Sequence, residues 1–232
     1  MSAKESPAIL QKYLQNKCQI PDLESYIQFH EKETVTAKDG VNVGSDSKLR
    51  NPRNLKGFIA NCNAPIKAWM NDWPTLLVQP KGFLIYIHDY ENFKIENDAL
   101  IVSVENPENV VNLSSASTLF PNRKTLFVSR YPQSNDLIKW LLQTSNEYLH
   151  FGDFDLKGIA IYYDEFKKHL GERGNFFIPP NIHEIIRKHG SRKLYDQQLN
   201  TSLNLSLLED SVKELVEIIH QERKGIEQQY FL

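Results

Sequence analysis

The chain has 232 residues, of which 41% are hydrophobic and 24% are charged, and its formal net charge at pH 7 is −2. These are ordinary values for globular proteins, so they exclude collagen, a coiled coil and disorder throughout as descriptions of the whole chain. No apolar run is long enough to span a membrane, the N-terminus lacks the apolar core of a signal peptide, and two cysteines do not make a disulfide framework. We therefore expect one large domain, or one domain with an appendage, in the cytoplasm and without a membrane partner.

The charge is unevenly distributed along the chain. Residues 47–67 contain five basic side chains and no acid, and residues 167–193 contain seven basic side chains against two acids. Because the rest of the chain is acidic, these two basic segments predict one contact surface for a polyanion. The alternative is that they are two solvated faces without a ligand.

The first 97 residues predict a mixed N-terminal region of helices and strands. Apolar residues recur at helical spacing over about 6–29, with Pro21 as an interruption, and glycines and prolines predict a loop or short strand over about 33–54. Further expected elements are a helix over 58–69 and a strand over 83–87. We interpret this region as an α+β unit that binds DNA or docks a partner.

From residue 98 onwards, predicted strands and helices alternate. Short apolar runs rich in β-branched residues predict the strands, and segments with helical spacing follow them. The expected strands are 99–104, 125–129, 147–152 and 175–178, and the expected helices are a short one after residue 107, then 134–142, 158–170 and 208–227. Because such alternation indicates right-handed crossovers, we expect residues 98–232 to form an α/β domain with a mainly parallel four-stranded sheet, flanked by helices and followed by a C-terminal helix.

Three carboxylates follow two of these strands. Glu105 follows the first strand, and Asp153 and Asp155 follow the third, with the spacing that puts alternate residues of an extended chain on one face. Ligands of α/β proteins bind at the carboxyl ends of parallel strands, where clustered carboxylates either raise a pKa or hold a cation. Oxygen ligands without a nearby thiolate favour Mg²⁺ or Mn²⁺. The alternative is that the two aspartates only cap the following helix.

The order of the elements around these acids resembles the toprim domain of topoisomerases, primases and related nucleases. That order is strand-Glu, helix, strand, helix, strand-Asp-x-Asp-x-x-Gly, helix, strand, and residues 104–106 and 151–158 carry its two acidic motifs. The second motif has the form found in topoisomerase VI A-subunit relatives and in the nuclease subunit of Wadjet anti-plasmid systems, the JetD-like family. Two shorter stretches, 45–48 and 227–228, are also similar to motifs of that family.

The resemblance implies a Mg²⁺- or Mn²⁺-dependent DNA endonuclease of the toprim type, acting in anti-plasmid or anti-phage defence. Asp153 and Asp155 would be metal ligands, and Glu105 would be a ligand or the general acid/base. The basic side chains expected to contact DNA phosphates are Lys48, Arg50, Arg53, Arg187, Lys188, Arg192 and Lys193. The implied partners are DNA, a condensin-like ATPase complex and a second copy of the chain.

The sequence also departs from this family and leaves other functions open. Residues 129–132 stand where the family has a glycine-rich turn, and Tyr162 and Tyr163 fall inside a helix, where packing is expected rather than DNA cleavage by a tyrosine. One alternative function is a topoisomerase VI A-like subunit or a non-catalytic DNA-binding subunit of a larger complex. Another is a structural or interaction protein with a decayed site.

Overall fold

A computed structural model describes residues 12, 15–16, 23–31, 55–78, 83–111, 119–120, 123–132 and 134–231. The chain divides into two compact units, Met1–Asn54 and Leu55–Leu232. In the first unit the structure describes helix α2 (Leu23–Glu31). It begins after Pro21 and overlaps the last part of the predicted helical stretch, which covers about 6–29. The predicted loop over 33–54 lies outside the described residues.

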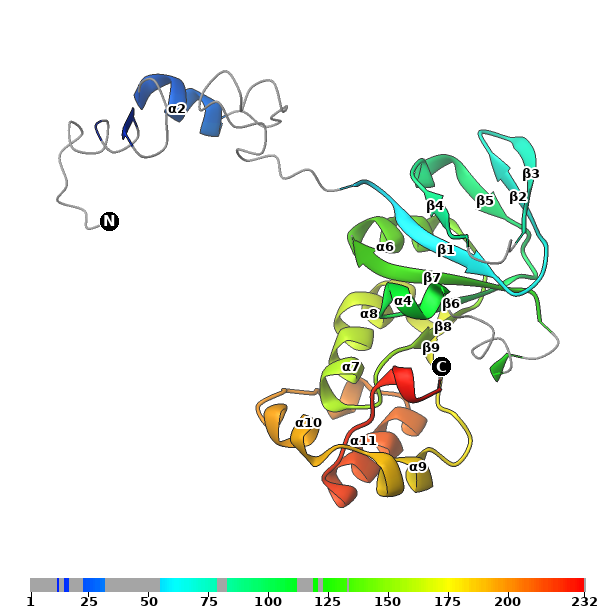
Figure 1. The fold of residues 1–232 in the computed structure, drawn as a ribbon, viewed down its shortest axis with the longest axis vertical. Helices are drawn as coiled ribbons and strands as arrows, with labels where there is room; N and C mark the ends of the chain where they lie inside the picture. The colour runs from blue at the N-terminus through cyan, green and yellow to red at the C-terminus, as the bar shows by residue number, and fades with distance from the viewer. Residues whose placement is uncertain are drawn as a thin grey trace. The chain divides into compact units, whose positions relative to one another are not determined.

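The second unit is built on a six-stranded mixed sheet, whose strands are labelled in Figure 1. In spatial order its strands are β4 (Ile85–Ile87), β1 (Phe58–Cys62), β7 (Thr125–Pro132), β6 (Leu100–Val104), β8 (Tyr148–Phe151) and β9 (Gly174–Phe176). The four strands from β7 to β9 are parallel to one another, whereas β1 is antiparallel to β7 and β4 is antiparallel to β1. The α/β class is therefore confirmed, but the sheet has six strands instead of the expected four.

The helices between the parallel strands follow the predicted order. α4 (Pro107–Val111) connects β6 to β7, and α6 (Ser134–Gln143) connects β7 to β8. The segment between β8 and β9 is α7 (Leu156–Ile161), a π-helical turn (Tyr162–Lys167) and α8 (Lys168–Leu170). The central strand β6 is buried along both faces, since every one of its residues is buried.

The predicted helix over 58–69 is wrong, because this segment forms two strands. β1 joins the large sheet, and β2 (Ile66–Met70) pairs with β3 (Trp73–Leu77) and β5 (Phe93–Ile95) in a separate three-stranded antiparallel sheet. Pro65 lies between β1 and β2, where it lacks the N–H that a continuous helix would need. The apolar spacing of the segment was compatible with a helix, but Pro65 and pairing with β7 decide for strands.

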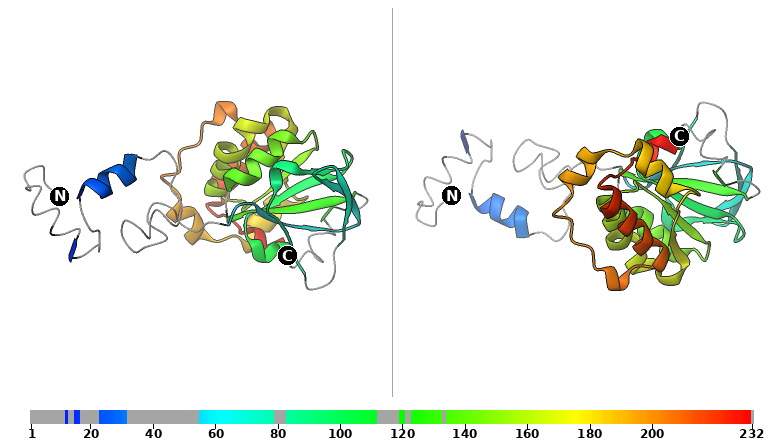
Figure 2. Two further views of the ribbon diagram at one scale, coloured as in Figure 1. Left: turned by 90° about the horizontal axis from the view of Figure 1, so that it is seen from above. Right: turned by 90° about the horizontal axis from the view of Figure 1, so that it is seen from below.

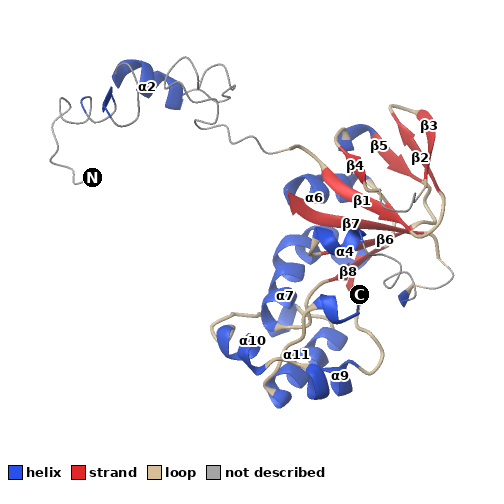
Figure 3. Ribbon diagram, viewed as in Figure 1, coloured by secondary structure: helices blue, strands red, loops and turns tan. Residues whose placement is uncertain are grey.

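The expected boundary after residue 97 lies inside the second unit. β1 and β4 belong to the same sheet as the strands that follow residue 98, so residues 55–97 are not separated from the α/β part of the chain. Figure 3 shows the small sheet of β2, β3 and β5 at the end of this unit opposite helices α9–α11.

Three helices follow β9 and lie together: α9 (Ile182–His189), α10 (Arg192–Gln197) and α11 (Asp210–Glu222). The views of Figure 2 show them on the side away from the small sheet. α11 is shorter than the predicted 208–227, and the residues after it run back in extended form towards the end of β8. Within the described residues, no helix is both long and apolar enough to cross a membrane.

Candidate functional site

The carboxyl ends of β6 and β8 bring the three predicted acids to one cavity. The two strands are parallel neighbours, with Val104 opposite Phe151, so the residues that follow them leave the sheet at the same edge. Glu105, Asp153 and Asp155 all line a cavity of about 530 Å³. Its other lining residues are Lys157, Gly158, Ile161, Leu194, Gln197 and Gln198. The sequence therefore predicted correctly which carboxylates come together.

Asp155 is held in place by two hydrogen bonds and is only 4% exposed. Its Oδ1 accepts a hydrogen bond from the backbone N–H of Gly158 at 2.8 Å, which caps α7, and its Oδ2 accepts one from the side-chain amide of Gln198 at 2.8 Å. The helix-cap alternative is thus correct for Asp155, and it is compatible with a second role because each carboxylate oxygen has two lone pairs. A side chain at Gly158 would lie 2.2 Å from the carbonyl oxygen of Asp153, so this close turn requires glycine.

Asp153 is not a helix cap, and its surroundings are acidic. Its Oδ1 accepts a hydrogen bond from the backbone N–H of Gln228 at 2.8 Å. Burial, and then the negative charges of Glu105, Asp155 and Glu227, together raise the pKa of Asp153 to about 7, against the lowering effect of the Gln228 bond. Burial and neighbouring carboxylates therefore both disfavour the ionised form of Asp153.

The C-terminal residues support the loop that carries Asp153. Gln228 is fully buried; its side-chain amide donates to the carbonyl oxygen of Phe151 and its Oε1 accepts from the amide of Asn109 at 2.7 Å. The backbone bridges Phe154–Ile226 and Ser191–Gly225 tie the same segment to the Asp153–Asp155 loop and to the turn before α10. Residues 227–228, singled out from the sequence, therefore lie next to Asp153.

The basic side chains of the second segment are exposed on α9 and α10. Lys188 pairs with Glu184 at 2.6 Å and Arg192 pairs with Asp196 at 3.5 Å, in each case one turn away on the same helix. Arg187 and Lys193 make no ion pair within the described part of the chain, and Lys193 belongs to α10, which also lines the cavity. The other three predicted DNA contacts, Lys48, Arg50 and Arg53, lie outside the described residues.

Two lining residues were not predicted as site residues. Lys157 is an exposed cation at the start of α7. Asp153, Asp155 and Lys157 stand at every second position, and this spacing is a sequence signal that Lys157 lies beside the two acids. Gln198 donates to Asp155 and accepts from the backbone N–H of Lys157 at 3.1 Å, so it closes the loop before α7. Nothing in the sequence around Gln198 indicates this contact.

The cavity fits a hard divalent cation by its chemistry. Its three acids offer carboxylate oxygens, and a bound cation would favour the ionised form of Asp153 that burial and neighbouring carboxylates disfavour. Among the described residues, no group of three His, Cys, Asp or Glu side chains is already arranged to hold a metal ion. A cation would therefore have to draw these carboxylates together.

Comparison with known families gives one match for the chain. A family model described as a domain of unknown function (DUF7281) matches residues 70–232, which is more than two thirds of the chain and includes every residue that lines the acidic cavity. No curated protein matches the chain.

Proposed function

The chain belongs to the DUF7281 domain family, and we propose that it is a Mg²⁺- or Mn²⁺-dependent nuclease that cleaves DNA phosphodiester bonds. The observation that carries this proposal is the convergence of Glu105, Asp153 and Asp155 on one cavity that Lys157 and the basic helix α10 also line. Carboxylates that repel one another and a neighbouring basic surface suit a metal ion together with a polyanionic substrate.

The finer fold proposed with this function is toprim-like. In its support, the parallel strands have the spatial order β7-β6-β8-β9, with the glutamate after β6 and the two aspartates after β8. Helices connect these strands in the order that the resemblance implies. The antiparallel strands β1 and β4 would then be additions at the β7 edge of such a sheet.

The residues of the cavity divide into three roles. Asp153 and Asp155 would hold the cation, and the bonds from Gly158 and Gln198 would keep Asp155 oriented towards it. Glu105 would serve as a further ligand or as the general acid/base. When bound, Mg²⁺ or Mn²⁺ would neutralise phosphate oxygens and supply an activated water.

The DNA would be held by cations around the cavity. Lys157 lines the cavity itself and would contact the phosphate that is cleaved, whereas Arg187 and Lys193 would contact neighbouring phosphates without reading sequence. The biological setting proposed with this activity is a cytoplasmic anti-plasmid or anti-phage complex with a condensin-like ATPase, in which the chain acts as a homodimer.

A non-catalytic DNA-binding subunit is the second candidate function. It is favoured by Asp155, whose two oxygens are already used to cap α7 and to bind Gln198. A topoisomerase-like reaction is disfavoured for Tyr162, because this residue is buried and its hydroxyl donates to Gly174 O at 3.0 Å and to Glu209 Oε1 at 2.5 Å. Such a hydroxyl is not available to attack DNA.

Incubation with supercoiled plasmid, with and without Mn²⁺, tests the proposal. We expect Mn²⁺-dependent nicking by the parent chain, none by Glu105→Gln, and unchanged nicking by Glu91→Gln, which alters a glutamate outside the cavity. Salt-sensitive DNA binding without nicking at any Mn²⁺ or Mg²⁺ concentration would support the DNA-binding subunit. A covalent protein–DNA adduct would support the topoisomerase-like alternative.

A further inference from the structure

His150 is a fully buried residue of β8 that lies directly below the acidic cavity. Its ring is enclosed by the rings of Tyr162, Phe166 and Phe176, with centroid distances of 5.4, 5.1 and 5.6 Å. These neighbours come from the helical segment after α7 and from β9, on two sides of the ring. The imidazole is therefore fixed in one orientation by packing.

The two ring nitrogens of His150 face different groups. Nδ1 lies 3.1 Å from the hydroxyl of Tyr148, and Nε2 lies 3.7 Å from Oε1 of Glu105. Nε2 is buried and makes no hydrogen bond in the structure. When Nδ1 accepts from the hydroxyl of Tyr148, Nε2 carries the ring proton, and the carboxylate oxygen of Glu105 is the acceptor that faces it.

Gly152 keeps the space between His150 and Glu105 open. A Cβ atom at this position would lie 2.6 Å from Nε2 of His150 and 2.7 Å from Oε1 of Glu105. Any larger residue would therefore enter the gap between the two groups. The ring is held by packing, so the carboxylate of Glu105 would be the group displaced.

We propose that His150 is a positioning residue, whose Nε2–H holds the carboxylate of Glu105 at the edge of the acidic cavity. A buried N–H without an acceptor is unfavourable, and a small movement of the Glu105 side chain closes the 3.7 Å separation to a hydrogen bond. The consequence for cleavage rests on the proposed function, whereas the contact between the two side chains does not. The alternative is a histidine that only fills the core.

Histidine NMR of the metal-free full chain tests the contact itself. With ¹⁵N-labelled histidine, the Nε2–H signal of His150 is identified by its loss in His150→Gln. We expect this signal to move in Glu105→Gln and in Gly152→Ala, and to stay unchanged in Glu222→Gln. Glu222 is a matched control because it pairs with another histidine, His183, at 2.8 Å.

Calorimetric titration with Mn²⁺, without DNA, tests the positioning role. We expect His150→Leu to weaken Mn²⁺ binding about 10- to 100-fold, which is the usual loss when a group that orients a metal ligand is removed. His150→Gln keeps an N–H near the Nε2 position and should recover most of that loss. The double variant with Glu105→Gln should bind Mn²⁺ no more weakly than Glu105→Gln alone.

The outcomes separate this proposal from the proposed function. If the parent neither binds Mn²⁺ nor cleaves DNA, but the His150 signal responds to Glu105→Gln, the nuclease proposal fails and the contact stands. If the signal does not respond, the contact is wrong, whatever the activity. If the signal responds but His150→Leu and His150→Gln bind Mn²⁺ like the parent, His150 is a core residue without a positioning role. The NMR comparison needs no stable His150→Leu protein, so poor folding of that variant does not prevent the test.

Discussion

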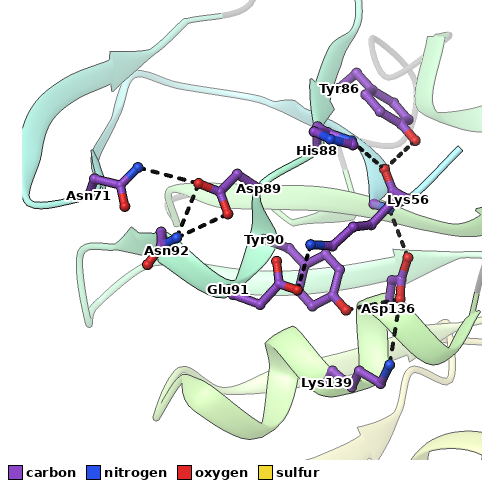
Figure 4. A network of polar contacts seen from close by, with 11 residues as sticks. Lys56, Asn71, Tyr86, His88, Asp89, Tyr90, Glu91, Asn92, Asp136 and Lys139 are labelled. Carbon is purple, nitrogen blue, oxygen red and sulfur yellow. Dashed lines mark hydrogen bonds and ion pairs between the residues drawn. The ribbon is translucent and has the colours of Figure 1, made fainter. Parts of the chain in front are cut away.

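Two groups of carboxylates at the large sheet differ in how their charges are balanced. Figure 4 shows the first group, which we name the polar network: Asp89, Glu91 and Asp136, with partners from the residues before β1, the turn between β2 and β3, the turn before β5, and α6. Asp136 accepts from Gly57 N at 2.8 Å and from the Tyr90 hydroxyl at 3.0 Å, and Glu91 pairs with Lys56 at 2.6 Å. Lys56 lowers the pKa of Glu91, as expected for a balanced pair.

The acidic cavity is the opposite case. There, burial and the charges of Glu105, Asp155 and Glu227 raise the pKa of Asp153 to about 7. The polar network shows that this fold can pair its carboxylates with cations where they serve stability. The raised pKa of Asp153 is what we propose that a bound cation relieves, and the following predictions test that difference.

The largest expected effect is on DNA cleavage by variants of the cavity. Asp153→Asn, Asp155→Asn and Glu105→Gln keep the side-chain shape but remove the charge that would hold the cation. Each should lower the cleavage rate about a thousandfold or more, because several kcal/mol of metal-derived stabilisation are lost. Rates on supercoiled plasmid measure this. Glu91→Gln in the polar network is the control, and a similar loss in that variant would remove the distinction between the two groups.

The pH dependence of stability should distinguish Asp153 from an ordinary aspartate. The pKa of Asp153 is 3.8 in ordinary surroundings and about 7 in the folded chain, so the folded state holds an extra proton between these values. The contribution of this proton to the free energy of unfolding is fully present below about pH 4. It is lost as the pH rises through about 7, the pKa of Asp153 in the folded chain. Asp153→Asn does not ionise, so its stability relative to the parent should rise over this range by at most about 4 kcal/mol.

Urea unfolding at several pH values in the absence of metal measures this difference. A constant difference between the parent and Asp153→Asn from pH 4 to pH 8 would contradict the raised pKa.

A smaller effect on stability is expected in the polar network. Asp136→Ala leaves the N–H of Gly57 and the hydroxyl of Tyr90 without their acceptor, which should lower the free energy of unfolding by about 2 kcal/mol. Asp89→Ala removes only exposed contacts to Asn71 and Asn92 and should cost less than about 1 kcal/mol. Urea unfolding compares the two variants. Equal stability of Asp136→Ala and the parent would show that the network does not stabilise the fold.

The smallest expected effect concerns DNA affinity. Arg187→Glu and Lys193→Glu alter cations that are not engaged on their own helices, whereas Lys188 and Arg192 each pair with an acid one turn away. Each of the first two changes should weaken binding to all duplexes alike and reduce the salt slope by about 0.9 per lost phosphate contact. Fluorescence anisotropy at several salt concentrations measures both quantities. Larger losses from Lys188→Glu and Arg192→Glu would reverse this order.

The acidic site could be predicted from local sequence, because strand ends and the period of two fix where Glu105, Asp153 and Asp155 lie. Its supporting contacts could not be predicted in the same way. Gln198 is 43 residues from Asp155 and Gln228 is 75 residues from Asp153, so only the folded chain brings them together. The 227–228 motif pointed to that region only through its family resemblance.

The errors in the predicted fold have local causes. The apolar spacing of 58–69 predicts a helix, but Pro65 interrupts this segment. Its first part is β1, whose pairing with β7 in the large sheet is a long-range contact that the local spacing does not indicate. The i, i+4 spacing of Glu184 and Lys188 is itself a sequence signal for their ion pair. It indicates that Lys188 is less available to bind DNA phosphates than Arg187.

The most direct test of the account is a set of thermal melts with and without Mn²⁺ for the parent, Asp153→Asn and Asp155→Asn. Without metal, Asp153→Asn should be at least as stable as the parent, because repulsion is relieved. Asp155→Asn still caps α7 but turns an amide N–H₂ towards the donating amide of Gln198, so it should be less stable than Asp153→Asn. Added Mn²⁺ should raise the midpoint of the parent most, because a ligand that binds only the folded state stabilises it. Equal Mn²⁺-induced shifts in all three proteins would contradict the claim that the acidic cavity binds a divalent cation.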